Sequence, residues 1–346
     1  MKDLFAPDFT RLRRVLQRRG EPDRVPFFEL FADTEIMAAI LGRPVAALQD
    51  RIDYQVKLGY DFVTVWVQNM NFPTAGQGTA ADTADLARAG RTFNLAGQGV
   101  IRHWADYERY PWPDPAHADY REIEEAARLM PEGMKAIVLT GHVLEMPMAI
   151  MGYEGLSLAV YDQPDLVEAV FQRVGETYLR IYRDLIGMDA VGAVFISDDL
   201  AFKTQTLMPP DFLRRMVFPW YRRYVEVCHG ADVPVILHSC GNLSAVMDDL
   251  IACGLDAKHS YEDQILPVEE MKRRYGQSLA VLGGLDLDFL CRATPDEVRA
   301  RTRRVLEACM PGGGYALGTG NSVANYLPVQ NFLAMLEEGR RSGIYG

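Results

Sequence analysis

The segment Val233-Pro234-Val235-Ile236-Leu237-His238-Ser239-Cys240-Gly241-Asn242 contains the pattern that decides the fold. Its first six residues form a short apolar, β-branched run, which predicts a buried strand over 233–238. Polar residues and a glycine follow at once, as in the loop after a strand of a parallel sheet. In a (β/α)8 barrel the active site is built on such loops, at the carboxyl ends of the strands. The segment therefore predicts a barrel strand that ends in functional side chains.

Similar apolar runs alternate with amphipathic stretches along the whole chain, a pattern typical of a parallel sheet wound with helices. The further strands are predicted at 25–31, 62–67, 136–140, 190–196, 255–259, 279–282 and 315–317. The helices are predicted at 33–42, 45–58, 121–130, 164–187, 210–229, 243–252, 267–275, 295–309 and 328–341. No Gly-x-Gly-x-x-Gly follows the first strand, so the usual dinucleotide fingerprint is missing. We expect an α/β fold, a single (β/α)8 TIM barrel.

The composition fits one soluble domain over residues 1–346. With 49% hydrophobic residues the chain can bury a large core, and barrels of this length remain single domains. The formal net charge of −11 disfavours binding to nucleic acid or to anionic membranes. The start of the chain does not resemble a signal peptide, and 18 consecutive apolar residues occur nowhere. We therefore expect a cytoplasmic protein with no nucleic-acid or membrane partner, whose five cysteines are reduced.

An irregular excursion of about 70–115 follows the second predicted strand. It contains Gly76, Gly78 and Gly90 and ends in a proline-rich connector, Tyr110-Pro111-Trp112-Pro113-Asp114-Pro115. An excursion of this length is more often a functional flap or an interface hairpin than a disordered loop. We expect an inserted hairpin or flap here, and it is where we would look for a contact in a homodimer.

The loops after the predicted strands collect carboxylates, imidazoles and a thiol at one rim of the barrel. The candidate side chains there are Glu29, Trp66, His142, Glu145, Asp198, Asp199, His238, Cys240, Asn242, His259 and Asn321. Such a collection predicts a metal site or an acid–base site. Trp66 lines an apolar pocket or belongs to the core, and His142 and His259 are more often structural than ligating.

The pair His238-x-Cys240 places a nitrogen and a sulfur donor on the same face of an extended chain, which favours zinc. Two ligands alone are a weak signal, and a buried cysteine beside a hydrogen-bonded histidine is the alternative. Asp198-Asp199 follows an apolar strand. One of these carboxylates faces the barrel mouth, as ligand, base or substrate contact, or the pair forms a helix cap or an acidic turn.

Several blocks of sequence, in order, resemble the uroporphyrinogen decarboxylase superfamily and, within it, the cobalamin-dependent methyltransferases of the methylcobamide:coenzyme M type. The blocks are Arg14–Gly20 with Asp23-Arg24-Val25-Pro26, Tyr110-Pro111-Trp112-Pro113-Asp114, Asp198-Asp199 with Leu207-Met208-Pro209-Pro210-Asp211-Phe212, Phe218-Pro219-Trp220-Tyr221, His238-Ser239-Cys240-Gly241-Asn242, Gly283-Gly284-Leu285-Asp286 and 314–328. The resemblance covers nearly the whole chain and implies the barrel fold.

Two departures bear on function. The arginine-rich motif with which the decarboxylases hold carboxylates corresponds here to Phe28-Glu29-Leu30-Phe31-Ala32-Asp33, which is acidic, and their functional histidine falls at Thr319. The resemblance therefore disfavours porphyrinogen decarboxylation. In the methyltransferases a His-x-Cys binds zinc, and it aligns with His238 and Cys240. Their third ligand, a cysteine, aligns with Asn321, so an acidic residue replaces it (Asp198, Asp199 or Glu262), or zinc is weak, replaced or absent.

The resemblance implies a methyltransferase that moves a methyl group between a cobalamin on a partner corrinoid protein and a small-molecule donor or acceptor. His238 and Cys240 would bind metal, and Glu29, Glu145, Asp198 and Asp199 would position substrate or transfer protons. Trp66, His142, Asn242, His259 and Asn321 would contact substrate, with Asn242 also orienting the metal ligands. The alternatives are a decarboxylase or lyase acting on a small non-porphyrin acid, and a metal-free binding barrel that has lost catalysis.

Overall fold

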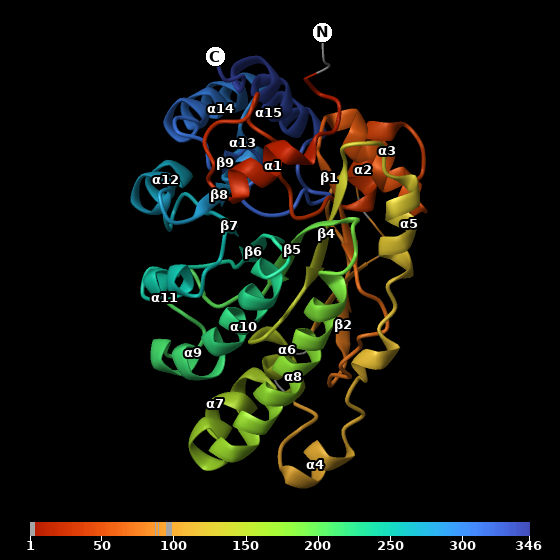
Figure 1. Cartoon of the computed structure of the whole chain (residues 1–346), viewed down its shortest axis with the longest axis vertical. Helices are drawn as coiled ribbons and strands as arrows, with labels where there is room; N and C mark the ends of the chain where they lie inside the picture. Colours follow the sequence, from red (N-terminus) through yellow and green to blue (C-terminus); the bar gives the residue numbers. More distant parts are fainter. Residues whose placement is uncertain (1–3, 87, 89, 95–98) are drawn as a thin grey trace.

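The computed structural model describes residues 4–86, 88, 90–94 and 99–346, and its centre is a curved parallel sheet (Figure 1). In spatial order the strands of this sheet are β1 (Phe62–Trp66), β4 (Lys135–Thr140), β5 (Val191–Ser197), β6 (Val235–His238), β7 (Ala257–His259), β8 (Ala280–Leu282) and β9 (Tyr315–Ala316). All neighbouring strands in it are parallel. The strands therefore end at one common rim, as the alternation of strands and helices predicted.

The two edge strands of the sheet contact the same segment of chain. Residues 25–32 pair in parallel with the region after β9 through the single bridges Phe27↔Leu317 and Ala32↔Val323. On the other side, the Thr64 hydroxyl of β1 donates to the carbonyl of Leu30 at 3.1 Å. The predicted strand 25–31 is thus wrong as a regular strand, because Pro26 has no N–H for a ladder. The segment nevertheless joins the two edges of the curled sheet.

The other predicted strands are confirmed to within two residues at each end. Strands β4, β5 and β6 consist mainly of apolar residues that are buried on both faces, as in a sheet covered by helices. Inside the sheet, the ring of Phe28 packs against Phe62 at 5.2 Å, Phe195 at 5.6 Å and His259 at 5.4 Å between ring centroids. This aromatic cluster fills the interior directly beside the histidines of the rim.

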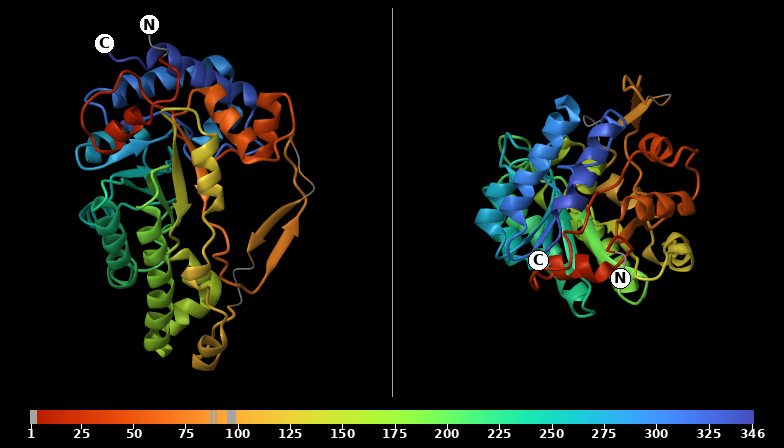
Figure 2. Two further views of the ribbon diagram at one scale, coloured as in Figure 1. Left: turned by 45° about the vertical axis from the view of Figure 1, so that its right-hand side comes forward. Right: turned by 90° about the horizontal axis from the view of Figure 1, so that it is seen from above.

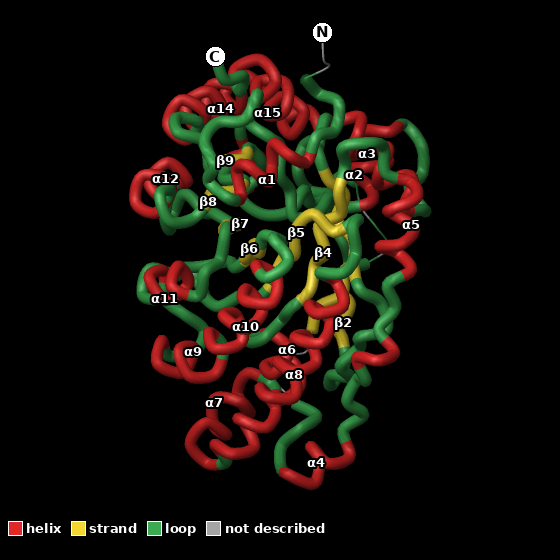
Figure 3. Tube along the Cα trace, in the orientation of Figure 1, coloured by secondary structure: helices red, strands yellow, loops and turns green. Residues whose placement is uncertain are grey.

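Helices surround the sheet, as the tube in Figure 3 shows. They are α1 (Phe9–Leu16), α2 (Thr34–Leu41), α3 (Leu48–Leu58), α4 (Trp104–Arg109), α5 (Arg121–Leu129), α6 (Glu145–Met151), α7 (Tyr153–Asp162), α8 (Pro164–Leu185), α9 (Pro210–Met216), α10 (Phe218–His229), α11 (Met247–Ala252), α12 (Val268–Tyr275), α13 (Leu287–Arg292), α14 (Pro295–Cys309) and α15 (Val329–Ser342), with a short 3-10 turn at Pro115–His117. None of the helices in these described ranges is both long and apolar enough to cross a bilayer.

Some helices differ from the prediction in their boundaries, and others were not predicted. The predicted helix 210–229 is divided into α9 and α10, because Pro219 cannot donate the hydrogen bond that would continue α9. The predicted helix 243–252 begins only at Met247, since the residues before it form a turn. The helices α1, α4, α6, α7 and α13 were not predicted; Gly152, with φ 74°, separates α6 from α7.

The excursion after β1 contains an antiparallel hairpin of β2 (Gln77–Ala80) and β3 (Arg91–Asn94), which stands apart from the curved sheet in Figure 2. Gly97, which the sequence places in the same excursion, lies outside the described residues. Asp82, in the segment that connects β2 to β3, links the hairpin to the region after β9, because Asn325 donates to its carboxylate at 2.6 Å. A hairpin is thus present where an insertion was predicted, and its action as a flap stays a prediction.

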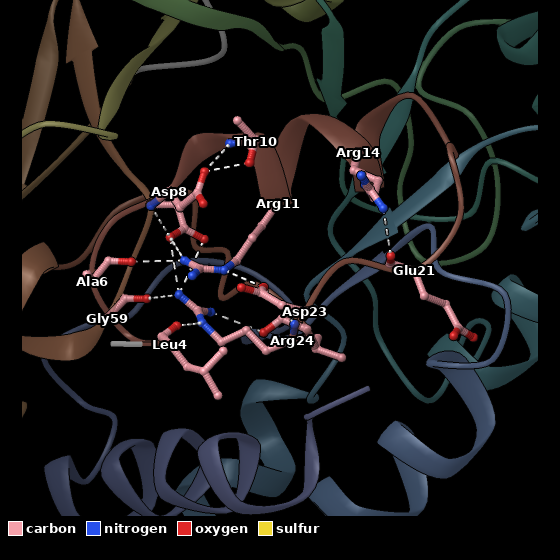
Figure 4. A network of polar contacts seen from close by, with 12 residues as sticks. Leu4, Ala6, Asp8, Thr10, Arg11, Arg14, Glu21, Asp23, Arg24 and Gly59 are labelled. Carbon is pink, nitrogen blue, oxygen red and sulfur yellow. Dashed lines mark hydrogen bonds and ion pairs between the residues drawn. The ribbon is translucent and has the colours of Figure 1, made fainter. Parts of the chain in front are cut away.

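A buried ion-pair network lies at the end of the sheet where the strands begin (Figure 4). The Asp61 carboxylate, fully buried, accepts from Arg11 at 3.0 Å and from Arg24 at 3.2 Å. Arg11 also pairs with Asp23, and Arg24 donates to the carbonyl of Gly59 at 2.9 Å. The network connects α1 to the start of β1 and to the segment that precedes Val25.

Candidate metal centre

The strand register brings the central residues of the site together. Ser197 of β5 pairs with His238 of β6, and His238 pairs with His259 of β7, so the three strands end side by side. Cys240 and Asp199 follow two residues after His238 and Ser197. One ligand atom each from Asp199, His238 and Cys240 lies within 4.8 Å of the others. Among the described residues this is the cluster of His, Cys, Asp and Glu side chains that is suited to a metal ion.

His238 is held in one orientation by a second histidine. Its Nδ1 lies 2.9 Å from Nδ1 of His259, while its Nε2 lies 3.5 Å from Cys240 Sγ and 3.7 Å from Asp199 Oδ1. Burial lowers the pKa of His238 to about 4 and holds that of His259 well below its ordinary value, so both rings are neutral at pH 7. If His238 carries its proton on Nδ1, it donates to His259 and presents a free Nε2 to the cluster. A fixed tautomer of this kind is what a metal-binding histidine requires.

The Cys240 sulfur is surrounded by hydrogen-bond donors. Asn321 Nδ2 lies 3.2 Å from Sγ, and the hydroxyl of Ser260 lies 3.4 Å from it. The backbone N–H of Cys240 donates to Asp199 Oδ1 at 2.7 Å, which ties the two candidate ligands together. Burial and the negative charge of Asp199 raise the pKa of the thiol to about 11. A cation bound between these groups would reverse that effect, because thiolate is the form that binds metals.

Asp198 and Asp199 point in different directions, although they are neighbours. The Asp198 carboxylate accepts the backbone N–H groups of Val143, Leu144 and Glu145 at 2.8 to 3.0 Å. The hydroxyl of Tyr221 donates to it at 2.7 Å. Burial and the charge of Glu145 raise the pKa of Asp198 to about 7. Asp198 therefore fixes the loop after β4, and Asp199 is the carboxylate that faces the cluster.

Glu29 and the pair His142–Glu145 lie on different segments, Glu29 on the segment 25–32 and the pair after β4. Glu29 is 3% exposed, and its carboxyl contacts the backbone N–H and the hydroxyl of Thr319. Its burial raises the pKa of Glu29 to about 8. His142 Nδ1 lies 3.3 Å from Glu145 Oε2. Burial opposes protonation of His142, but the hydrogen bond and the charge of Glu145 prevail and raise its pKa.

Two predicted site residues have their side chains engaged elsewhere. The Trp66 ring lies under the guanidinium of Arg51 of α3, with 5.2 Å to the ring centroid. Asn242 Oδ1 accepts from the backbone N–H and the hydroxyl of Ser244, at 3.1 and 2.7 Å. Asn242 also lines a surface groove of about 550 Å³ formed with residues 204–210. Both roles, as substrate contacts, stay predictions.

Sequence reasoning missed Ser260 and Lys258, which flank His259. Ser260 has a φ of 85°, rare for a residue other than glycine, and its hydroxyl reaches Cys240. Lys258 is 5% exposed and donates to the carbonyl of Ser260 at 2.6 Å, which holds this bend in place. Strained residues of this kind gather at functional sites. One feature of the sequence could have indicated them. A lysine and a serine lie directly before and after the histidine that ends a buried strand.

Comparison with known proteins places this architecture in a family. A curated relative, the uroporphyrinogen decarboxylase of Alkalilimnicola ehrlichii, is 26% identical over 94% of this chain and 92% of its own. The methylcobamide:CoM methyltransferase MtaA of Methanosarcina barkeri is also 26% identical, over 41% of this chain and 40% of its own.

A solved structure described as a methyltransferase from Methanosarcina mazei shares the fold, with a TM-score of 0.69 at 16% identity. It covers 96% of this chain and 98% of its own. The profile of the uroporphyrinogen decarboxylase (URO-D) family matches residues 97–342, which include β4 to β9 and every candidate ligand. From this match over more than half of its length, the chain belongs to the uroporphyrinogen decarboxylase family.

Proposed function

We propose that this chain is a zinc-dependent methyltransferase that moves a methyl group between a corrinoid on a partner protein and a small molecule. The observation that carries the proposal is the convergence of Asp199, His238 and Cys240 at the rim, with their ligand atoms within 4.8 Å of one another. Catalytic zinc sites use three protein ligands and leave a fourth position open. The three side chains provide that number of ligands, from the ends of two adjacent strands.

The donor set fits zinc. Nitrogen, sulfur and carboxylate oxygen are the ligand atoms that zinc prefers, and the site offers one of each. His238 is neutral, as a ligand must be, and His259 holds its ring. Asp199 takes the part that the resemblance assigned to a cysteine at position 321, where Asn321 instead donates to the Cys240 sulfur. When bound, zinc would supply Lewis acidity that favours the anionic form of a thiol or hydroxyl substrate.

The surrounding side chains support methyl transfer. In the direction of acceptor methylation, a sulfur or oxygen of the acceptor takes the methyl group from the methylated corrinoid, whose cobalt keeps the electron pair. The acceptor gives up its proton, and the His142–Glu145 pair at the end of β4 is suited to receive it. Ser260 and Asn321 keep the Cys240 sulfur in place during this exchange.

The acidic rim favours methyl transfer over decarboxylation. A decarboxylase binds a carboxylated substrate, whereas Glu145 and Asp199 here present carboxyl groups around the site. The MtaA relatives add support, because their name describes the transfer of a methyl group from a methylcobamide. Since those matches span less than half of this chain, the substrate and partner belong to the proposal.

The test combines metal analysis with an optical assay. Purified protein should contain about one zinc ion per chain, as expected for a three-ligand site. With methylcobalamin and a thiol or phenol acceptor it should change the cobalt absorbance spectrum. Cys240→Ala and Asp199→Ala should lose both properties. Cys291→Ala, which removes a half-buried thiol of α13, is the matched control and should keep both.

Two results would refute the proposal. One is a trace zinc content in the unmodified protein that equals that of Cys240→Ala. The other is an unchanged cobalt spectrum with every acceptor together with release of carbon dioxide from a small acid, which would identify a lyase.

A further inference from the structure

We propose that Glu29 is a positioning residue that, as a neutral carboxylic acid, donates a hydrogen bond to Thr319 and thereby fixes the loop that holds Asn321 against Cys240. The inference rests on the proposed metal site, because Cys240 is where its effect is felt. It assigns Glu29 a role in which it touches neither the substrate nor the metal.

The contacts form a continuous chain from Glu29 to the sulfur. Glu29 Oε1 accepts the backbone N–H of Thr319 at 2.8 Å, and Glu29 Oε2 contacts the Thr319 hydroxyl. The same hydroxyl lies 2.9 Å from the carbonyl oxygen of Asn321. The side chain of Asn321 then reaches Cys240 Sγ at 3.2 Å.

The number of protons available to these hydrogen bonds determines whether Glu29 is protonated. The Thr319 hydroxyl has one proton, and the Asn321 carbonyl can only accept. If the hydroxyl donates to Asn321, the contact with Glu29 requires a proton on the carboxyl. An ionised Glu29 would instead accept a hydrogen bond from the Thr319 hydroxyl, and the Asn321 carbonyl would then lack this donor. Neutral Glu29 satisfies both contacts, so it is the form that matches the observed geometry.

The surroundings of Glu29 favour the same form. The side chain is buried, and burial raises its pKa to about 8. The titratable groups that face it are the phenols of Tyr54 on α3 and Tyr60, whose own pKa values are raised well above 10.0, first by burial and further by the charge of Glu29. Both are neutral at pH 7, and the hydrogen bonds from Thr319 lower the pKa of Glu29 without cancelling the effect of burial.

The loop after β9 transmits the contact because it is tightly clamped on both sides of Thr319. A Cβ atom on Gly318 would lie 1.8 Å from the carbonyl oxygen of Phe28, and one on Gly320 would lie 2.2 Å from that of Tyr261. Only glycine permits this close approach. Thr319 is therefore pressed against the segment that holds Glu29, and a change in their hydrogen bond must move Asn321 or leave its carbonyl unpaired.

The protonation state is tested without metal, by infrared difference spectroscopy of wild type against Glu29→Gln in the full chain. We expect a band of a protonated carboxyl group in the wild type at pH 7, which disappears as the pH is raised through about 8. The absence of this band at pH 7 would overturn the proposal.

The positioning role is tested by zinc affinity, measured by chelator competition. Groups that hold metal ligands in place typically contribute 10-fold to 100-fold to affinity, so Glu29→Ala and Thr319→Val should each weaken zinc binding by about 10-fold. Glu29→Gln can still donate to Thr319, and Thr319→Ser keeps the hydroxyl. Both should restore affinity to within about twofold of wild type.

A control separates positioning from loss of a buried carboxyl in general. Glu338 of α15 is 2% exposed and accepts from Arg303 at 2.9 Å, remote in sequence from the cluster. Glu338→Gln should lower thermal stability without changing zinc affinity. Equal weakening by Glu29→Gln and Glu29→Ala would refute the positioning role. If zinc binds to no variant, the proposed function fails, and the infrared band still decides the state of Glu29.

Discussion

Buried carboxyl groups lie at both ends of the strands, in opposite electrostatic settings. At the end where the strands begin, Asp61 contacts the guanidinium groups of Arg11 and Arg24. At the rim, where the strands end, Glu29 and Asp198 are equally buried, but they accept hydrogen bonds from uncharged N–H and O–H groups. Burial raises the pKa of all three carboxyls, to about 8 at Glu29 and about 7 at Asp198, whereas at Asp61 the positive charges of Arg24 and Arg11 oppose the rise. One end uses charge to connect segments, whereas the other keeps carboxyl groups close to their titration point, as active sites do.

The largest effect should come from removing the central charge of the ion-pair network. Asp61→Asn leaves two buried guanidinium groups without their shared partner, and we expect the free energy of unfolding to fall by about 3–5 kcal/mol. Urea denaturation measures it. Asp23→Asn, whose side chain is 35% exposed, should cost much less. A smaller loss for Asp61→Asn than for Asp23→Asn would contradict the central place of Asp61, and zinc affinity should change in neither folded variant.

At the rim, Asp198→Asn should lower the free energy of unfolding by about 2–3 kcal/mol, because its amide would oppose the backbone N–H groups of the loop after β4. Tyr221→Phe removes only one donor to the same carboxylate and should cost about 1 kcal/mol. Denaturation of both variants tests this order. Tyr224→Phe, whose hydroxyl contacts the carbonyl of Gly175, is the control for the loss of a phenol. An Asp198→Asn variant as stable as wild type would show that this carboxylate does not fix the loop.

The raised pKa of Glu29 at the rim should make the stability of the fold depend on pH. Glu29 has a pKa of about 8 in the folded chain against 4.5 as the ordinary value, so the folded state binds its proton more tightly. The stability that this adds is complete below pH 4.5 and is lost as the pH rises to about 8. Glu29→Gln should reduce the decline between pH 5 and 8 by at least about 1.4 kcal/mol, the equivalent of one pKa unit. If thermal denaturation shows that wild type and Glu29→Gln lose the same stability over this pH range, Glu29 is not neutral in the folded chain.

The smallest expected change is a gain in zinc affinity, from a substitution at the rim. Asn321→Cys places a second thiol beside Cys240 and should tighten zinc binding by about 10-fold, or about 1.4 kcal/mol. Chelator competition measures it, and Ser322→Cys at the next position is the control. Unchanged or weaker binding by Asn321→Cys would mean that position 321 does not face the metal.

Most of the fold was predictable, because buried parallel strands are short apolar runs that end in polar loops. The segment 25–31 has that pattern, but Pro26 prevents a regular ladder of backbone hydrogen bonds. The pattern of apolar residues contains no information about a missing N–H group. The short helices α6 and α7 escaped prediction, since their residues are largely apolar and show little amphipathic contrast.

The site was predictable in position and less so in detail. The pair His238 and Cys240 and the neighbourhood of Asn321 follow from the strand ends and from the family resemblance. The choice between Asp198 and Asp199 could not be made from sequence, because adjacent residues on an extended chain point to opposite sides and the face depends on register. The hydrogen bonds of Glu29 to Thr319 join residues 290 positions apart, a pairing that no local pattern encodes.

The closing segment of the chain lies far from the mouth of the sheet. Val25, at the beginning of the segment 25–32, donates its N–H to the carbonyl of Gly343 at 2.7 Å, and Ile344 pairs with Arg24. A tag, a fluorescent fusion or a surface linker attached after Gly346 would therefore be mounted at the end opposite to the ligands. Immobilised in this way, the molecule would present its open rim outward, and binding of the proposed corrinoid protein could be tested in capture experiments.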